Sequence, residues 1–217
     1  MKKNENIGHL RKSYEQGVLS DYALQEDPFV LFDLWFKRAD AEERIEEANA
    51  MTLATLDEQG YPKARVVLLK QYGAEGFVFY TNYNSQKGKA IAHHPQVSLS
   101  FFWPALEQQI IIRGKASRIA AEASDAYFNS RPLGSQLGAI ASSQSQIISS
   151  REQLEDRLAE LQQRYTDTFP QRPAHWGGYN VVPHSIEFWQ GRPNRLHDRI
   201  EFIKTPNGQW LGSRLAP

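Results

Sequence analysis

Glu187-Phe-Trp-Gln-Gly-Arg-Pro-Asn-Arg-Leu-His-Asp-Arg199 is the stretch of sequence that most constrains the fold of this chain. Its first half has the alternation of a strand, because Ile186 and Phe188 fall on one face and the residues between them on the other. Gly191 and Pro193 then end the extended run in a turn. The stretch therefore predicts a β-strand that leads into a turn.

The second half of this stretch is rich in positive charge. If the chain extends again after the turn, Arg195, His197 and Arg199 alternate onto one face. Three cationic groups on one face repel each other unless an anion lies opposite them. Forked arginine donors and a tunable histidine suit a phosphorylated or otherwise anionic ligand. A solvated, charged strand edge is the alternative interpretation of the same residues.

Length, charge and cysteine content restrict the class of protein. The 217 residues suit one domain or two small ones. The 25 basic and 25 acidic side chains balance, which argues against nucleic-acid and anionic-membrane partners. The sequence has no Cys, so disulfides, iron–sulfur clusters and cysteine nucleophiles are excluded. No secretory signal or membrane-spanning run is recognisable, so we expect a cytoplasmic protein.

The first half of the chain is predicted to form a helix and then a run of short strands. Asp27 followed by Pro28 is typical of a helix start, and residues 41–48 have the character of a charged continuation of that helix. The apolar period then changes to two. Strands are expected at 51–56, 63–70, 76–82, 97–103 and 108–119, with a turn at 57–60 and a helix from Asn84 or Ser85 to His93.

The second half is predicted to form helices and then strands. Helices are expected at 121–129 and 134–142, and a third helix begins at a capping box of Ser149 and Glu152. An apolar stripe on that third helix predicts that it packs on the sheet. Strands follow at 179–182, 185–190, 199–204 and 209–211. This order lacks βαβ alternation, so we expect a mainly β (α+β) fold, an antiparallel barrel with peripheral helices.

The familiar motifs of nucleotide and metal sites are absent from the sequence. There is no dinucleotide-binding glycine motif, no P-loop and no His-Glu-x-x-His. The adjacent His93 and His94 point in different directions on a helix, so no metal site is predicted. Basic residues recur instead at strand ends and helix starts. They are Arg65, Lys70, Lys87, Arg131, Arg195 and Arg199. Each alone is typical of a surface charge, but together, in a chain of zero net charge, they indicate one or two bound phosphate groups.

Arg65 and Lys70 share a pocket only under a geometric condition. They are five positions apart, an odd step, so in a regular strand they face opposite sides of the sheet. The strand must therefore end or bulge between them, or the pocket must wrap around a sheet edge.

These basic residues and their neighbours, in this order, resemble the pyridoxine/pyridoxamine 5′-phosphate oxidase family. The similarity runs from about His9 to Pro217. The matching pieces are Arg65-Val-Val-Leu-Leu-Lys70, Phe79-Tyr-Thr-Asn82, Ser85-x-Lys87, Tyr127-Phe-x-Ser-Arg-Pro132, Ser135-Gln136, Gln144-Ser145, Trp176-Gly-Gly-Tyr179, Glu187-Phe-Trp-Gln-Gly191, Arg195-Leu-His-Asp-Arg199 and Arg214-Leu-Ala-Pro217. The Arg-Leu-His-Asp-Arg piece is the most specific of them.

The resemblance implies a fold, a reaction and a partner. It implies a Greek-key-like, FMN-binding split β-barrel at residues 27–217, preceded by a flexible lid segment at residues 1–26. It implies a homodimer with FMN at the subunit interface. The implied reaction is the oxidation of pyridoxamine or pyridoxine 5′-phosphate to pyridoxal 5′-phosphate in vitamin B6 metabolism, with O₂ reduced to hydrogen peroxide. The flavin carries this chemistry, which agrees with the absence of a nucleophile triad.

The resemblance also implies a role for individual residues. FMN would be held by Arg65, Val66, Val67, Leu68, Leu69, Lys70, Tyr80, Thr81, Gln86, Lys87, Gln109, Gln144, Ser145, Trp189 and Arg199. Substrate would be held by Arg11, Tyr14, Lys70, Tyr127, Arg131, Ser135, Arg195 and His197, of which Arg195 and His197 would be catalytic. Arg11 and Tyr14 would belong to the lid. Gln86 stands where the family usually has Arg, which removes one positive charge from the FMN phosphate site.

Two other functions remain open at this point. A split barrel can retain FMN or pyridoxal phosphate as a carrier or sensor without turnover. A flavin reductase of the same barrel type would use a nicotinamide donor. The presence of Arg195 and His197 beside a full set of phosphate-binding residues favours the oxidase.

Overall fold

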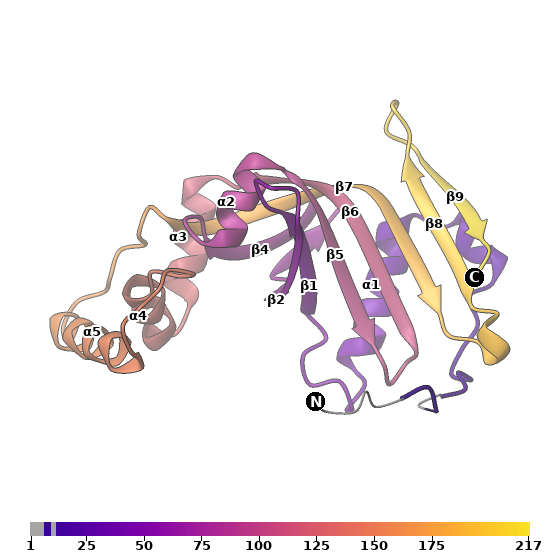
Figure 1. Ribbon diagram of the computed structural model, residues 1–217. Helices are drawn as coiled ribbons and strands as arrows, with labels where there is room; N and C mark the ends of the chain where they lie inside the picture. Colours follow the sequence, from indigo (N-terminus) through magenta and orange to yellow (C-terminus); the bar gives the residue numbers. More distant parts are fainter. Residues whose placement is uncertain (1–6, 10–11) are drawn as a thin grey trace. The chain divides into compact units, whose positions relative to one another are not determined.

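The computed structural model describes residues 7–9 and 12–217, which divide into two compact units (Figure 1). Unit 1 takes in the chain up to Ala48 together with Phe101–Ile111 and Ser185–Pro217. Unit 2 consists of Asn49–Ser100 and Ile112–His184. None of the helices in the described ranges has the length and apolar character needed to cross a lipid bilayer.

Antiparallel β-structure dominates the part of the chain that the structure describes. Nine strands there form one sheet in the order β2-β1-β5-β6-β7-β4-β3, and β8 pairs with β7 and with β9. The strands are β1 (Ala50–Leu56), β2 (Pro62–Leu68), β3 (Gln71–Gly73), β4 (Gly76–Asn82), β5 (Gln96–Trp103), β6 (Gln108–Arg118), β7 (Trp176–Gln190), β8 (Asp198–Lys204) and β9 (Trp210–Leu215). The pairings β1–β2, β1–β5, β3–β4, β4–β7, β7–β8 and β8–β9 are antiparallel, so the expected fold class is confirmed. The short strand β3 was not predicted.

Helix α1 (Pro28–Asp40) provides much of the core of unit 1. Its start is as predicted, because the Asp27 side chain accepts a hydrogen bond from the Phe29 N–H at 2.8 Å. Its buried face places Phe32 against Phe101, with ring centroids 5.5 Å apart, in an edge-to-face arrangement. Such aromatic pairs contribute roughly 1 kcal/mol beyond the area they bury.

The predicted helical continuation at residues 41–48 is wrong, because α1 ends at Asp40. The Arg44 guanidinium instead pairs with the Glu42 carboxylate, and Nε lies 2.6 Å from Oε1. Residues two apart do not face each other on a helix, so this pair favours a turn. The Ala48 carbonyl then accepts the indole N–H of Trp103 at 3.1 Å, which ties the end of the segment to β5.

Unit 2 begins with the predicted hairpin of β1 and β2. Gly60, in the turn, has a positive φ of 84° that favours glycine. The predicted helix after β4 is also present as α2 (Gln86–His93), and the Ser85 side chain caps it by accepting from the Gly88 N–H. The hairpin and the helix were both predictable, because the residues that specify each of them lie within a few positions of one another.

Strand β7 is one continuous strand of 15 residues, where the sequence predicted two. Pro183 lies inside it and has no N–H to donate. Residues 176–181 of the strand pair with β4, and residues 185–190 pair with β8. Pro183 therefore falls between these two ladders, where neither pairing requires its missing donor.

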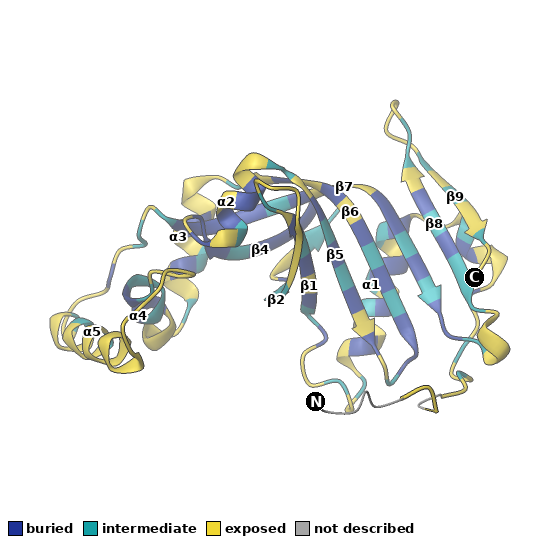
Figure 2. Cartoon of the chain, in the orientation of Figure 1, coloured by how far each residue is buried: buried dark blue, intermediate teal, exposed yellow. Residues whose placement is uncertain are grey.

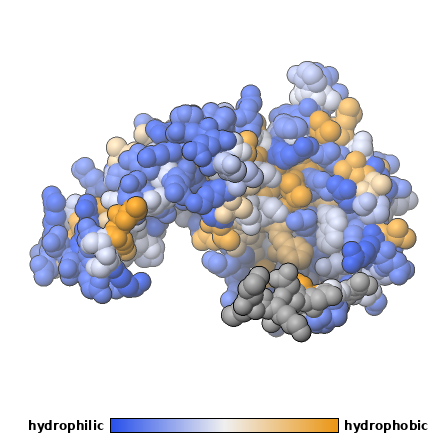
Figure 3. All heavy atoms as spheres, viewed as in Figure 1, coloured by the Kyte–Doolittle hydropathy of each residue, from blue (hydrophilic) through white to orange (hydrophobic). Residues whose placement is uncertain are grey.

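Helices α3 (Ala121–Ser130), α4 (Leu133–Ala141) and α5 (Arg151–Arg164) complete unit 2. The cap of α5 is Ser150 and not Ser149, because the Ser150 hydroxyl accepts from the Gln153 N–H. Packing of α5 on the sheet is also not found, because its main neighbour is α4. None of its residues is buried, and Figures 2 and 3 show its exposed and largely hydrophilic surface.

Candidate functional site

A cleft of about 540 Å³ in unit 2 brings together many of the predicted cofactor and substrate residues. The predicted residues that line it are Val66, Val67, Leu68, Lys70, Tyr80, Thr81, Lys87, Tyr127, Arg131, Ser135 and Gln144. Residues that were not singled out also line it, among them Asn82, Pro132, Ser142 and Trp176. The cleft therefore draws on strands β2, β4 and β7 and on helices α2, α3 and α4.

Strand β2 ends between Arg65 and Lys70, but only Lys70 of the two lines the cleft. The strand stops at Leu68, and Lys70 follows it with its N–H bonded to the Val78 carbonyl at 2.8 Å. Lys70 therefore lines the cleft without keeping the alternation of the strand. The Arg65 side chain lies outside the cleft lining and donates to the Thr55 hydroxyl at 2.7 Å.

Lys87 is a half-buried cation at one end of this cleft. Its Nζ donates to Gln144 Oε1 at 3.1 Å, and the Thr81 hydroxyl lies 3.4 Å from the same oxygen. Burial lowers the pKa of Lys87, and the nearby charge of Arg65 lowers it further. Within the described ranges, no carboxylate pairs with Lys87. The attraction of a nearby anion would offset both effects on the pKa of Lys87, so this part of the cleft favours a negatively charged group.

Aromatic rings and a half-buried guanidinium also line the cleft. The rings of Tyr80 and Tyr127 stack with centroids 3.8 Å apart, and Tyr80 also stacks on Trp176 at 5.5 Å. The Arg131 guanidinium lies over the Trp176 ring, 4.7 Å from its centroid. Burial raises the pKa of Tyr80 and lowers that of Arg131.

Arg131 carries an unsatisfied donor in this cleft. Its Nη1 is buried and has no hydrogen-bond partner in the described part of the chain. A buried donor without an acceptor is costly, by roughly 1–3 kcal/mol, so an acceptor from a bound group would stabilise Arg131. Arg131 directly follows α3 and precedes Pro132, which holds it in an extended backbone conformation with ψ of 150°. The unpaired N–H of this guanidinium, which lies over Trp176, suits a phosphate oxygen.

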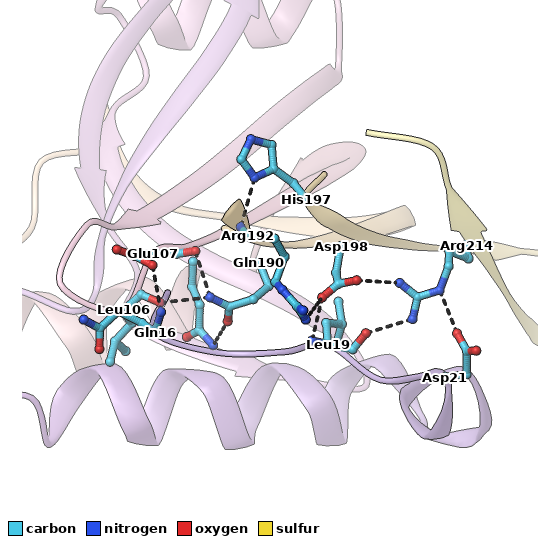
Figure 4. A network of polar contacts seen from close by, with 11 residues as sticks. Gln16, Leu19, Asp21, Leu106, Glu107, Gln190, Arg192, His197, Asp198 and Arg214 are labelled. Atoms are coloured by element: carbon cyan, nitrogen blue, oxygen red, sulfur yellow. Dashed lines mark hydrogen bonds and ion pairs between the residues drawn. The ribbon is translucent and has the colours of Figure 1, made fainter. Parts of the chain in front are cut away.

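Unit 1 holds a second cluster, made of Tyr14, Trp189 and His197. The Trp189 and His197 rings have centroids 4.7 Å apart, and the Tyr14 ring lies 5.6 Å from Trp189 and 5.7 Å from His197. Nδ1 of His197 accepts the backbone N–H of Arg192 at 3.0 Å (Figure 4). The proton of neutral His197 is therefore on Nε2, which remains available as a donor.

The predicted alternation of Arg195, His197 and Arg199 on one strand face is wrong. After Gly191 the chain first forms a 3-10 turn at Pro193–Arg195. It extends again only in β8, which begins at Asp198, so Arg195 and His197 lie before the strand. Asn194 and Arg195 have φ angles of 56° and 62°, which breaks the alternation. Arg195 is exposed at the surface of this turn.

Arg199, in β8, pairs with a carboxylate of the neighbouring strand. Its Nε donates to Glu187 Oε1 at 2.8 Å, and its Nη1 donates to the Ala216 carbonyl at 2.9 Å. The hydrogen bond that Arg199 donates to the Glu187 carboxylate raises the pKa of Arg199. Its charge is therefore already compensated within unit 1.

The remaining predicted residues lie outside the lining of the unit 2 cleft. Gln86 accepts from Lys63 Nζ at 2.5 Å, so an ammonium lies beside the position where the family usually has Arg. Leu69 is buried, Gln109 is half-buried in β6, and Ser145 is exposed with a φ of 72°. Arg11 lies outside the described residues.

Comparison with known protein families and structures agrees with this geometry. A family model described as pyridoxamine 5′-phosphate oxidase matches residues 38–165. A second, described as the pyridoxine 5′-phosphate oxidase C-terminal dimerisation region, matches residues 176–217. The solved structure of PhzG from Burkholderia lata 383 in complex with tetrahydrophenazine-1-carboxylic acid superposes with a TM-score of 0.85 at 29% identity, covering 95% of this chain and 100% of that one. The expected split-barrel fold is thereby confirmed.

Full-length relatives are still closer in sequence. The pyridoxine/pyridoxamine 5′-phosphate oxidase of Flavobacterium psychrophilum is 52% identical over 213 residues, which cover 98% of this chain and 100% of the relative. The protein of the same name from Synechocystis sp. is 50% identical over 212 residues, covering 98% of each chain. This chain belongs to the pyridoxine/pyridoxamine 5′-phosphate oxidase family.

Proposed function

We propose that this protein catalyses the FMN-dependent oxidation of pyridoxamine 5′-phosphate and pyridoxine 5′-phosphate to pyridoxal 5′-phosphate, with O₂ reduced to hydrogen peroxide. The observation that carries the proposal is the cleft of unit 2 in a chain of this family. Among the residues that the structure describes, the buried Arg131 donor in this cleft has no acceptor and the Lys87 ammonium has no carboxylate partner. Phosphate monoesters carry nearly two negative charges at neutral pH and satisfy both groups.

The substrate phosphate is assigned to one group of cleft residues. Lys70, Tyr127, Arg131 and Ser135 all line the cleft. The Arg131 guanidinium offers a forked donor and the Lys70 ammonium offers a point charge. The hydroxyls of Tyr127 and Ser135 can donate further hydrogen bonds to the phosphate. Lys70 is exposed and Arg131 is half-buried, so a phosphate entering from solvent meets Lys70 first.

The residues present also fit FMN as the cofactor. Its phosphate matches Lys87, whose pKa is lowered by burial and by Arg65, and its ring system matches the apolar side chains of Val66 and Leu68 in the cleft. The other residues assigned to FMN are Val67, Leu69, Lys70, Tyr80, Thr81, Gln86, Gln109, Gln144, Ser145, Trp189 and Arg199. When bound, FMN supplies the acceptor for the substrate's two electrons and passes them to O₂.

His197 and Arg195 are assigned to the C4′ substituent of the substrate. The hydrogen bond from Arg192 fixes the imidazole so that Nε2 presents its proton. Nε2 then orients the amine or alcohol at C4′ and exchanges a proton with it. Arg195 adds a positive charge from the neighbouring turn.

We further propose that the protein works in the cytoplasm as a homodimer, with FMN at the interface between the subunits. The match of residues 176–217 to a dimerisation region supports dimerisation. A test of the interfacial site mixes Arg131→Ala chains with Arg195→Leu chains during refolding. If two subunits build each site, random mixing restores about a quarter of the sites, because half of the dimers are mixed and each has one intact site. Rates are compared at substrate concentrations well below KM, where both parents are slow, and a mixture no faster than its parents contradicts this arrangement.

Anaerobic reduction of the bound flavin tests the function itself. The purified protein is expected to be yellow, to bleach when pyridoxamine 5′-phosphate or pyridoxine 5′-phosphate is added without oxygen, and to recover its colour in air as pyridoxal 5′-phosphate appears. Bleaching by a nicotinamide donor but by neither phosphate would indicate a flavin reductase. A yellow protein that no donor bleaches would indicate a carrier or sensor, and either result would overturn the oxidase.

A further inference from the structure

Unit 1 contains a buried carboxylate that the proposed substrate and cofactor sites do not use. Glu107 is 1% exposed and ends the turn between β5 and β6. A buried carboxylate requires donors, and those of Glu107 come from a distant part of the chain. Oε2 accepts the backbone N–H groups of Glu15 at 2.6 Å and Gln16 at 2.9 Å, and Oε1 pairs with Lys12 Nζ at 3.0 Å.

These contacts keep the carboxylate ionised. Burial raises the pKa of Glu107, but the N–H donors of Gln16 and Glu15 and the ammonium of Lys12 outweigh burial and hold the pKa below its usual value. Figure 4 shows Gln16 beside Glu107 in the same polar network as Gln190. The charged side chain therefore fastens residues 12–17, which we call the N-terminal strap, to the rest of unit 1.

The strap carries Tyr14, whose ring contacts His197 and Trp189. Gly191 makes room for that ring. A Cβ at Gly191 would lie 2.7 Å from Cγ of Tyr14 and 3.1 Å from Cβ of Glu107, both closer than normal packing allows. The main chain of Gly191 also donates to the Glu107 carbonyl at 2.8 Å. Tyr14 and Glu107 therefore pack so closely on Gly191 that a larger residue at position 191 would displace them.

We propose that Glu107 is a positioning residue, whose carboxylate fastens the N-terminal strap so that Tyr14 stands against His197 and Trp189. The catalytic consequence rests on the proposed function, because His197 is assigned there to the C4′ substituent. With the strap fastened, Tyr14 provides an aromatic side to the position of the substrate. Loss of the carboxylate frees the strap, weakens substrate binding and raises KM.

The backbone at Glu107 allows this role to be separated from a role in folding. Its φ is 55°, a conformation that glycine adopts without strain and glutamate does not. Glu107→Gly relaxes the main chain and removes the carboxylate, whereas Glu107→Gln keeps the shape and removes only the charge. In both variants the carbonyl at position 107 still accepts from Gly191. A fastening role predicts that both variants release the strap, although one of them relieves strain.

Hydrogen exchange in the full-length protein tests the fastening directly. The amides of Glu15 and Gln16 are expected to exchange about tenfold faster or more in Glu107→Gln and in Glu107→Gly, because the first variant replaces their charged acceptor with a neutral one and the second removes it. Glu155→Gln, which removes an exposed carboxylate of α5, is the matched control and leaves these rates unchanged. Unchanged exchange at both amides in both Glu107 variants overturns the proposal.

A kinetic cycle tests whether Glu107 acts through Tyr14. Glu107→Gln and Tyr14→Ala are each expected to raise KM for pyridoxamine 5′-phosphate by roughly three- to tenfold with a smaller change in kcat. In the Tyr14→Ala background, Glu107→Gln adds nothing further. Additive effects in the double variant overturn the proposal. If the wild-type protein has no oxidase activity, the proposed function fails, while the exchange rates still decide whether Glu107 fastens the strap.

Discussion

The backbone N–H of Arg192 donates to Nδ1 of His197 across 3.0 Å. This single hydrogen bond decides which nitrogen of the neutral imidazole carries the proton. It also connects the Gly191 turn to the side chain that we assign to the C4′ substituent. Orientation and protonation of His197 are therefore set by the main chain of the neighbouring turn.

Two substitutions at His197 separate its two nitrogens. His197→Gln keeps an N–H donor near the position of Nε2, whereas His197→Asn keeps an acceptor for Arg192 but leaves nothing near Nε2. We expect kcat to fall by about 100-fold in His197→Asn and by clearly less in His197→Gln, because the donor at Nε2 does the work. Steady-state turnover with pyridoxamine 5′-phosphate is the measurement. An equal loss in both variants contradicts this division.

Replacement of Arg195 is expected to separate turnover from cofactor content. Arg195→Leu should lower kcat far more than it lowers the FMN content of the purified protein, because Arg195 is assigned to the substrate and not to FMN. Absorbance gives the flavin content and peroxide release gives the rate. Arg151→Leu, which removes an exposed arginine of α5, is the control. Turnover equal to that of the wild-type protein in Arg195→Leu would remove Arg195 from the site.

Arg131→Ala is expected to raise KM for the phosphorylated substrates by about tenfold or more, because the phosphate loses its forked donor. Arg131→Lys should recover part of the loss, since it restores the charge but not the fork. Initial rates over a range of substrate concentrations give both constants. An unchanged KM in Arg131→Ala would show that the substrate phosphate binds elsewhere.

The lowered pKa of Lys87 predicts a pH dependence on the alkaline side. Its pKa in the fold lies below the ordinary value of 10.5, so the charged form is disfavoured in the free protein and favoured when FMN phosphate is bound. FMN affinity should therefore fall as pH rises through the lowered pKa of Lys87. In the same window the free protein gains stability with pH, because the unfolded chain then holds the extra proton. Flavin fluorescence titrations and melting curves report the two trends, and Lys87→Met should abolish both.

Local signals made much of the fold predictable from the sequence. Asp27 and Pro28 begin α1, and Ser85 caps α2, as expected from capping chemistry. The scattered basic residues alone indicated bound phosphate, but which of them share a cleft could be anticipated only through the resemblance, because Lys70 and Arg131 lie 61 positions apart and meet only in the folded chain. Trp176 lies under the Arg131 guanidinium, but the sequence did not indicate that it lines the cleft. It appeared only as the first residue of the matching piece Trp176-Gly-Gly-Tyr179.

The failures have a common physical origin in contacts between distant residues. Residues 41–48 have helical character, but the Ala48 carbonyl accepts a hydrogen bond from the indole N–H of the distant Trp103. Strand β7 was divided at Pro183 because sequence does not show which ladder each residue joins. No local signal pointed to Glu107, since its partners in residues 12–16 lie more than ninety positions away.

Arg195 occupies a backbone conformation with a φ of 62°, and Asn194 before it has a φ of 56°. Asparagine tolerates this region, whereas arginine costs about 1 kcal/mol there relative to glycine. Selection for heat resistance alone would therefore favour glycine at position 195 and remove the guanidinium. A laboratory evolution experiment that screens for melting temperature and not for turnover should find Arg195→Gly early. The substitution raises stability and removes the guanidinium that we assign to the substrate.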